Sequence, residues 1–539
     1  MPQGYLMLVL HNHLPYVRHP EHEEFLEERW FFEAVLESYL PVLYILEKLH
    51  EDGVDYSITL SFSPTLLSMF DDELLQKRFV RHLEKLMELG EKEVERTINL
   101  PEQPLARMYR DKIRKIHDYY TERCRGNIIN LLKDLNSTGR VELITCPATH
   151  GFLPFMREEA VDAQIDTGLK TFERFLGFKP AGMWLPECGY LPGLEKILKK
   201  HDIRYFFLDT HGIIHADPPN FMGGAYSPVQ CPNGVIAFGR DPESSKQVWS
   251  KDEGYPGDYD YREYYRDIGF DLPMNYIKPY IHPDGIRLNT GFKYHRITGK
   301  TEHKELYNPD AAKEKAAIHA GNFMFNRQKQ IEYLCSIMDR KPLVVAPYDG
   351  ELFGHWWYEG PIWLDMLLRK IHFDQDEVKT ITPTGYLSMY SKNHIAQPSM
   401  SSWGDKGYFE VWLNGSNDWI YRHLHKAADF MVELADTHKN AEGFLRTALQ
   451  QAARELLLAQ ASDWAFMMTA GSMVEYARKR TIDHLGRFFK LYRDIKDKTL
   501  DKVWLNVVMS KDNVFPDIDY RIYSSHGSEA AQKVLSAWS

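Results

Sequence analysis

The chain has 539 residues and a formal net charge of −11, with 44% hydrophobic and 26% charged residues. This length exceeds the usual size of one hydrophobic core, so we expect two or three folded units. The negative charge argues against a basic nucleic-acid interface, and no stretch approaches the ~20 apolar residues of a membrane span, so we expect neither nucleic acid nor a membrane as partner.

The N-terminal segment, MPQGYLMLVLHNHLPY, has no basic start, and its apolar run is too short for a secretory signal peptide. The five cysteines are an odd number and form no Cys-x-x-Cys pair. Neither a disulfide scaffold nor a cysteine zinc site is therefore expected. Together these features predict a cytoplasmic protein.

Seven short apolar runs predict β-strands, and each is followed by polar or small residues. They lie at residues 6–10, 56–60, 141–145, 181–185, 205–208, 235–238 and 343–346. Helical patterns between several of them, such as 31–49 and 160–175, favour an α/β fold with a parallel sheet. Polar groups at the carboxyl ends of the strands are typical of the active face of a βα barrel. Seven strands instead of eight predict a distorted or incomplete barrel.

Two regions interrupt this alternation of strands and helices. Residues 72–138 are charged and helical in period, which predicts an inserted helical subdomain with outer bounds 65–140. Residues 211–300 are rich in Gly, Pro, Asp and Tyr, and loops of this length are usually functional. Near the C-terminus helical spacing returns. We therefore predict a catalytic barrel over 1–410 and a C-terminal helical domain over 411–539.

Two acidic residues at predicted strand ends are candidates for catalysis. Glu187 follows the fourth strand in GMWLPECGY, and Asp349 follows the seventh in LVVAPYDGELFGHWWYEG. A single strand-end carboxylate is more often a helix cap or a salt-bridge partner, but here both are flanked by aromatic residues. Cleavage of a glycosidic bond requires a pair of carboxyl groups, one to protonate the leaving oxygen and one to attack or to activate water.

Three histidines also lie at predicted strand ends. His11 and His13 end the first strand, where their spacing of two places them on the same side of an extended chain. His150 ends the third strand. Three histidines could bind zinc, or they could donate hydrogen bonds to sugar hydroxyls. The sequence leaves both interpretations open.

Aromatic and acidic residues near the start of the C-terminal region are further candidates. Trp403, Trp412 and Trp419 are clustered among Gly, Ser and Asn, where they could stack on sugar rings. Each alone would more often belong to the core. Asp463 interrupts the apolar face of AQASDWAFMM. It is either a salt-bridge partner or a group that extends into the site.

Five ordered blocks of the sequence resemble glycoside hydrolase family 57, and within it the α-1,4-glucan branching enzymes and relatives first described as α-amylases. The blocks are HNHLPY, CPATHGFLP, GMWLPECGY, APYDGELFGHWWYEG and AQASDWAFMM. YREYYRDIGFDLP and DNVFPDIDYR resemble further branching-enzyme stretches. The resemblance runs nearly end to end. It implies a distorted (β/α)7 barrel with a helical insertion and a C-terminal α-helical domain that helps to close the cleft.

The resemblance also implies roles for individual residues. Glu187 would be the nucleophile and Asp349 the general acid/base of a retaining mechanism. Phe270 stands where a branching enzyme is expected to have a tryptophan, and Tyr226 is our candidate for a mobile-loop tyrosine that favours transfer over hydrolysis. The residues expected to bind substrate are His11, His13, His150, Arg262, Phe270, His355, Trp356, Trp403, Trp412, Asp463 and Tyr226.

The predicted function is a retaining transglycosylase that cuts α-1,4 bonds in an α-glucan and forms α-1,6 branches. An α-amylase or a 4-α-glucanotransferase using the same site is the nearest alternative. A zinc-dependent polysaccharide deacetylase or α-mannosidase is more remote, because these enzymes typically have aspartate near the first strand where this chain has His-x-His. A non-catalytic glucan-binding protein is a further alternative. We expect no metal or other cofactor, an amylose- or glycogen-like partner, and a monomer or small homo-oligomer.

Overall fold

The computed structural model describes residues 2–220, 223–250 and 253–525. Its centre is a sheet in which seven parallel strands follow the order β7-β5-β4-β3-β2-β1-β8. Their bounds are β1 (Gly4–Asn12), β2 (Ile58–Phe62), β3 (Val141–Thr145), β4 (Gly182–Met183), β5 (Tyr205–Leu208), β7 (Ile236–Gly239) and β8 (Leu343–Asp349). The sheet curls so that β7 and β8, the two ends of this order, approach each other. The backbone N–H of Asp241, just after β7, donates to the carbonyl of Val345 in β8 at 2.8 Å. The predicted distorted (β/α)7 barrel is confirmed.

Three short strands extend the sheet. They are β6 (Val229–Gln230), β9 (Val378–Thr380) and β10 (His394–Ile395). β6 is antiparallel to β7, β10 pairs with β6, and β9 pairs with the start of β1. None of the three bears a predicted site residue.

The strands separate two layers of core, which fixes the direction of the residues at their ends. All nine residues of β1 are buried, as expected for a parallel strand covered on both faces. Leu8 of β1 packs in the cluster shared with the surrounding helices, whereas Val9 packs with Val345 and Trp184 inside the barrel. Since side chains alternate along a strand, His11 points inward like Val9.

Strand register then aligns several polar residues. His11 is the partner of Asp349 on one side and of Ser61 on the other. Asp349 is four residues beyond the inward Val345, so it also points into the barrel. The carboxyl ends of β1, β2 and β8 thus present a histidine, a serine and an acid at one level.

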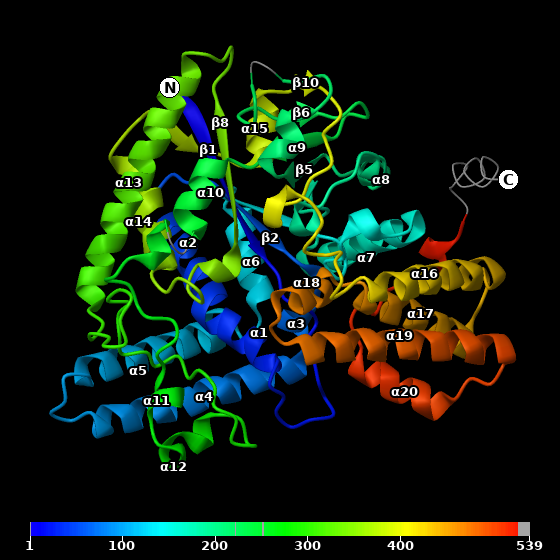
Figure 1. Cartoon of the computed structure of the whole chain (residues 1–539), viewed down its shortest axis with the longest axis horizontal. Helices are drawn as coiled ribbons and strands as arrows, with labels where there is room; N and C mark the ends of the chain where they lie inside the picture. Colours follow the sequence, from blue (N-terminus) through cyan, green and yellow to red (C-terminus); the bar gives the residue numbers. More distant parts are fainter. Residues whose placement is uncertain (1, 221–222, 251–252, 526–539) are drawn as a thin grey trace.

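The helices predicted between the strands are present. Residues 31–49 fall within α1 (Glu28–Ala34), a π-helical segment (Val35–Tyr39) and α2 (Leu40–Glu51), and residues 160–175 fall within α7 (Glu158–Leu176). The other helices of the barrel portion are α8 (Leu194–Lys200), α9 (Thr210–Ile214), α10 (Pro242–Trp249), α11 (Ile268–Asp271), α12 (Met274–Ile277), α13 (Pro309–Cys335), α14 (Gly360–Phe373) and α15 (Pro383–Met389). In Figure 1, α13 and α14 stand beside β1 and β8.

The predicted insertion consists of helices between β2 and β3. They are α3 (Pro64–Asp71), α4 (Glu73–Arg96), α5 (Gln103–Asp118), a π-helical segment (Tyr119–Arg123) and α6 (Ile128–Ser137). The long helices α4 and α5 lie alongside each other below the barrel, next to α11 and α12 (Figure 1). The buried Glu93 of α4 accepts hydrogen bonds from the hydroxyls of Tyr276 and Tyr294, both at 2.8 Å. This contact holds the loop that follows β7 against the inserted helices.

The C-terminal region is helical, as predicted. It comprises α16 (Trp419–Thr437), α17 (Gly443–Ala459), α18 (Ser462–Ala470), α19 (Val474–Asp497) and α20 (Lys502–Lys511). These helices lie together on one side of the barrel (Figure 1), and their apolar faces belong to the same core cluster as the helices around β1. Residues 526–539 of the predicted domain lie outside the described residues. Within the described part of the chain, no helix combines the length and apolar character that crossing a bilayer requires.

Candidate active site

Glu187 occupies a strained position just after β4. Its backbone is left-handed (φ 61°, ψ 19°), which is uncommon for a residue with a side chain and is often found at functional sites. Trp403 donates its indole N–H to Oε2 at 2.8 Å, and Ser462 donates its hydroxyl to Oε1 at 3.1 Å. The Trp403 backbone N–H also donates to the Glu187 carbonyl at 2.9 Å. The carboxyl group is therefore fixed by one donor on each oxygen.

Burial raises the pKa of Glu187 to about 7, against the opposing effect of the Trp403 hydrogen bond. The nearby Asp463 carboxylate raises this pKa further, while Ser462 and His13 lower it. Desolvation disfavours the charged form, and donors favour it. A carboxyl group balanced in this way is ionised in an appreciable fraction of molecules near neutral pH.

Asp349, at the end of β8, lies in a different environment. Its pKa is raised well above the usual range, first by burial, then by repulsion from Glu351 and from Glu187, with Arg240 acting in the opposite direction. No hydrogen bond to its carboxyl group is present among the described residues. Two hydrogen-bond donors thus favour the charged form of Glu187, whereas among the described residues Asp349 has the charge of Arg240 and no such donor. The arrangement keeps a proton on Asp349 when Glu187 ionises.

The three predicted histidines meet beside these carboxyl groups. His11 Nε2 lies 2.9 Å from His150 Nε2, and the rings of His13 and His150 stack with centroids 3.8 Å apart. Burial lowers the pKa of His11 and His150 well below the usual value, so both are neutral. His13 Nε2 contacts Asp463 at 3.1 Å, and His11 stacks on Trp184. Three of these residues could also hold a metal ion, since one ligand atom from each of His13, His150 and Asp463 lies within 4.8 Å of the others.

The predicted aromatic residues differ in exposure. Trp403 is at the nucleophile candidate, as described above. Trp356 is 56% exposed and stacks on Tyr264 with ring centroids 4.9 Å apart. Trp412 is only 1% exposed and lies parallel to Phe152 at 4.7 Å. In this structure Trp356 can therefore contact a ligand directly, whereas Trp412 is buried and packs against the ring of Phe152.

Three other predicted residues lie near the loop that follows β7. Phe270 is 48% exposed on α11. Arg262 is buried, with its guanidinium 3.8 Å from the centre of the Tyr358 ring. His355 Nδ1 bonds the Glu37 carboxylate at 2.6 Å, which raises the pKa of His355 against the effect of burial. Arg262 and His355 are thus engaged by protein groups.

Tyr226 lies away from the ends of the strands that bear the site. Its carbonyl accepts from the backbone N–H of Leu343, the first residue of β8, whereas Asp349 is the last. Its hydroxyl accepts a hydrogen bond from Gln330. In this structure Tyr226 therefore lies apart from the carboxyl ends of the strands, and its role as the loop tyrosine stays a prediction.

Three contributors were not among the predicted site residues. Ser462 touches Glu187, and Glu351 accepts the His13 backbone N–H at 3.1 Å and the Tyr39 hydroxyl. Arg240 is a cation close enough to lower the pKa of Asp349. Ser462 lies next to Asp463, and Glu351 lies two residues after Asp349. The sequence blocks that contain these predicted residues could therefore have pointed to both.

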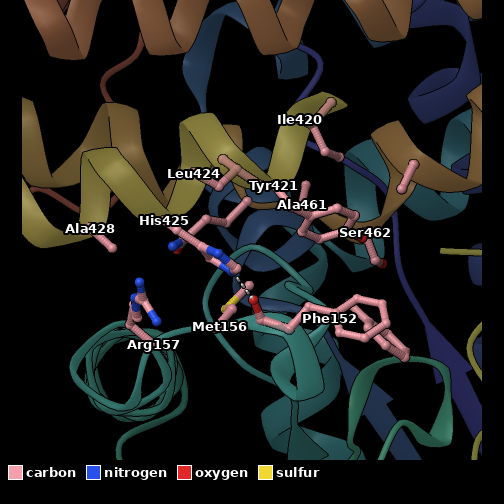
Figure 2. A pocket seen from close by; sticks show the side chains of 13 residues that line it. Phe152, Met156, Arg157, Ile420, Tyr421, Leu424, His425, Ala428, Ala461 and Ser462 are labelled. Carbon is pink, nitrogen blue, oxygen red and sulfur yellow. Dashed lines mark hydrogen bonds between the residues drawn. The ribbon is translucent and has the colours of Figure 1, made fainter. Parts of the chain in front are cut away.

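A pocket lies next to the site, between the loop after β3 and helix α16. Figure 2 shows Ala461 and Ser462 at one end of it and Arg157 and Ala428 at the other. Much of its wall is apolar, and the imidazole of His425 bonds the Phe155 carbonyl at 2.7 Å. Ser462 therefore contacts the nucleophile candidate and also lines this pocket.

Comparisons with known proteins agree with this arrangement. The family model for glycosyl hydrolase family 57 matches residues 7–398, and a model for the C-terminal region of 1,4-alpha-glucan branching enzymes matches residues 423–523. A 1,4-alpha-glucan branching enzyme of Thermococcus kodakarensis is 34% identical over 95% of this chain and 77% of its own length.

Two solved structures are similar over nearly the whole chain. An alpha-amylase of Thermotoga maritima is 43% identical with a TM-score of 0.91, covering 97% of this chain and 99% of that one. A branching enzyme of Pyrococcus horikoshii is 35% identical with a TM-score of 0.87, covering 97% of both chains. The chain belongs to glycosyl hydrolase family 57 and has the C-terminal region of the family's branching enzymes.

Proposed function

We propose that the chain is a 1,4-α-glucan branching enzyme, a retaining transglycosylase that cleaves α-1,4 bonds and forms α-1,6 branches. One observation carries the proposal: two buried carboxyl groups at strand ends, with Glu187 oriented by two donors and Asp349 kept protonated. Glycosidic bond cleavage requires such a pair. The relatives described as branching enzymes support the choice of reaction.

In the proposed mechanism, Glu187 attacks the anomeric carbon while Asp349 gives its proton to the glycosidic oxygen. One glucan segment leaves with a free 4-hydroxyl, and the other stays bound to Glu187 as a glycosyl ester. Asp349, now ionised, takes the proton from the 6-hydroxyl of an acceptor glucan. The acceptor oxygen displaces Glu187, and the two inversions leave the anomeric configuration unchanged.

Hydrolysis is the second candidate, because the similar structure from Thermotoga maritima is described as an alpha-amylase. The first half-reaction is then the same, and water replaces the 6-hydroxyl in the second. Transfer to a 4-hydroxyl would give a 4-α-glucanotransferase. The choice depends on how well the site excludes water and orients a sugar acceptor.

The first experiment incubates the purified chain with amylose and follows new α-1,6 linkages by proton NMR together with reducing ends. A branching enzyme makes many branches with few reducing ends, and an amylase makes reducing ends without branches. Glu187→Gln should abolish both products by more than about 1,000-fold, since a nucleophile is lost, while amylose binding is kept. Near-normal turnover by this variant would contradict the nucleophile role.

Further expectations belong to this proposal. The histidines, Trp356, Trp403 and Asp463 bind an amylose- or glycogen-like chain, the protein acts in the cytoplasm in glycogen synthesis, and it is a monomer or small homo-oligomer. We also propose that residues 1–410, with the insertion at 65–140, form the catalytic unit and that 411–539 form the C-terminal unit. The contact of Ser462 with Glu187 supports a C-terminal unit that completes the site.

A further inference from the structure

We propose that Ser462, the first residue of α18, is a positioning residue for the nucleophile, and that it connects Glu187 to a relay of hydrogen bonds through His150 and His11 to Ser61. The inference rests on the proposed function, because it assigns Ser462 a role in that reaction. It concerns how the carboxylate is oriented, and it applies whichever acceptor ends the reaction.

The Ser462 hydroxyl is held from both sides. It lies 3.1 Å from Glu187 Oε1 and 2.9 Å from His150 Nδ1, and the residue is 2% exposed. Its backbone N–H donates to the His150 carbonyl at 3.0 Å. The neighbouring pair Gly151 and Ala461 forms a bridge between the loop after β3 and the start of α18. The hydroxyl therefore has a fixed place beside the carboxylate.

Counting protons gives the relay one direction. An ionised carboxylate only accepts, so the single hydroxyl proton of Ser462 goes to Glu187, and Ser462 must accept from His150 Nδ1–H. A neutral imidazole has one N–H. His150 Nε2 therefore accepts from His11 Nε2–H at 2.9 Å, and His11 Nδ1 accepts from the Ser61 hydroxyl at 3.1 Å. Every donor in the chain points toward Glu187.

The relay explains why two histidines are buried next to an acid without being charged. Protonation of His150 or His11 would put a second hydrogen where the chain needs an acceptor, and burial opposes that charge. Neutral rings in a fixed tautomer orient the serine, and the serine orients Oε1. Trp403 orients Oε2 in the same way from the opposite side.

The position of Ser462 links the C-terminal region to the chemistry. Asp463, the next residue, contacts His13, whose ring stacks on His150. The first turn of α18 thus places two adjacent side chains on two stacked histidines, which lie in the segments after β1 and β3. A displacement of α18 would move the donor away from Oε1.

Three variants test the proposal in the full-length chain. Ser462→Ala removes the donor. Ser462→Thr keeps a hydroxyl and adds one methyl group to a residue that lines the pocket shown in Figure 2. Thr469→Ala is the matched control on the same helix, because its hydroxyl contacts the carbonyls of Val411 and Ala465 and the amides of two asparagines, but not the site.

Steady-state kinetics with amylose are measured over pH, with the sum of new branches and new reducing ends as the rate. For Ser462→Ala we expect kcat to fall on the order of 10- to 100-fold, as when a reacting group is misplaced or loses a hydrogen-bond donor. KM should stay within about twofold of the unmodified enzyme. Removing a donor from the charged form raises the pKa of Glu187. Since Glu187 must be ionised to attack, the acidic limb of the profile moves to higher pH.

Ser462→Thr should recover most of the lost rate and the original acidic limb, and Thr469→Ala should change neither. A slow Ser462→Ala enzyme with an unmoved limb and no recovery by threonine would overturn the proposal, since a purely structural serine behaves in that way. Near-normal turnover by Ser462→Ala would also overturn it. The proposed function is tested separately, because near-normal activity of Glu187→Gln would contradict it. Products that consist of reducing ends alone would change the reaction to hydrolysis and leave the role of Ser462 intact.

Discussion

The acid candidate gives a prediction at the scale of a single residue. Repulsion from Glu351 is the second cause of the raised pKa of Asp349, after burial. Glu351→Gln removes this charge and keeps the oxygen that accepts from Tyr39 and His13, so the pKa of Asp349 falls. Because Asp349 must be protonated to act as the acid, activity is lost as pH rises through its pKa. The basic limb of the kcat/KM profile should therefore move to lower pH, with the maximal rate reduced less than about tenfold.

The matched control for this prediction is Glu142→Gln. Glu142 is a carboxylate of β3 that accepts from Tyr205 and Thr384 and is absent from the groups that act on Asp349. It should leave the basic limb in place. If the limb does not move in Glu351→Gln, repulsion from Glu351 does not set the pKa of Asp349.

The placement of individual candidate residues was predictable where a strand end fixes it. Glu187, Asp349, His11 and His150 follow short apolar runs, and parallel strands bring their carboxyl ends together. Ser462 was not found, because a serine has no distinctive pattern and its partner is 275 positions away. The position of Tyr226 was not predictable, because the segment around it has no periodicity from which its end of the barrel could be inferred.

At the scale of elements, the contact between α4 and the loop after β7 gives a stability prediction. Glu93→Ala leaves the hydroxyls of Tyr276 and Tyr294 and the guanidinium of Arg96 without their shared acceptor. We expect the free energy of unfolding to fall by about 1–3 kcal/mol. Amide exchange should increase in the loop around these tyrosines while the β1–β8 pair stays protected. Chemical denaturation and hydrogen exchange measure the two effects.

Glu88→Ala is the control on the same helix. Glu88 contacts Tyr280 and Lys92, but its side chain is 61% exposed, and exposed pairs contribute little. Its effect should stay within about 0.5 kcal/mol. Equal losses in the two variants would mean that the buried acceptor at Glu93 does not hold the loop.

Elements with a strong period were predicted, and those ordered by tertiary contacts were not. The helices at 31–49 and 160–175 and the seven strands follow from apolar spacing. Apart from the strand at 235–238, the segment 211–300 lacks such spacing, yet it contains the short helices α10 to α12. Contacts such as the hydrogen bond from the Tyr109 hydroxyl to the Lys293 carbonyl at 2.6 Å hold this segment against α5, and no local pattern encodes them.

At the scale of the whole molecule, the two ends of the chain share one core and one site. The cluster that contains Leu8 of β1 also contains Leu456 of α17 and Phe488 of α19. The Thr149 hydroxyl, in the loop after β3, donates to the Leu457 carbonyl. A barrel and a helical region joined in this way should not unfold independently, although length alone predicted separable units.

Arg480 of α19 tests whether the barrel and the C-terminal helices unfold together. Its buried guanidinium donates to Tyr476 and His484, and it lies 3.4 Å from Nε2 of His19 in the loop after β1. Calorimetry of the unmodified chain should show one transition, with equal calorimetric and van't Hoff enthalpies. Arg480→Met leaves buried polar groups unpaired and should lower stability by about 1–3 kcal/mol. Because the core is continuous, tryptophan fluorescence and residual activity should be lost at the same reduced temperature.

The exposed ion pair of Arg157 with Asp429 supplies the control, Arg157→Met, which should change the free energy of unfolding by less than about 1 kcal/mol. Two separate transitions, or loss of helical signal before activity, would show instead that the C-terminal helices melt as a unit of their own.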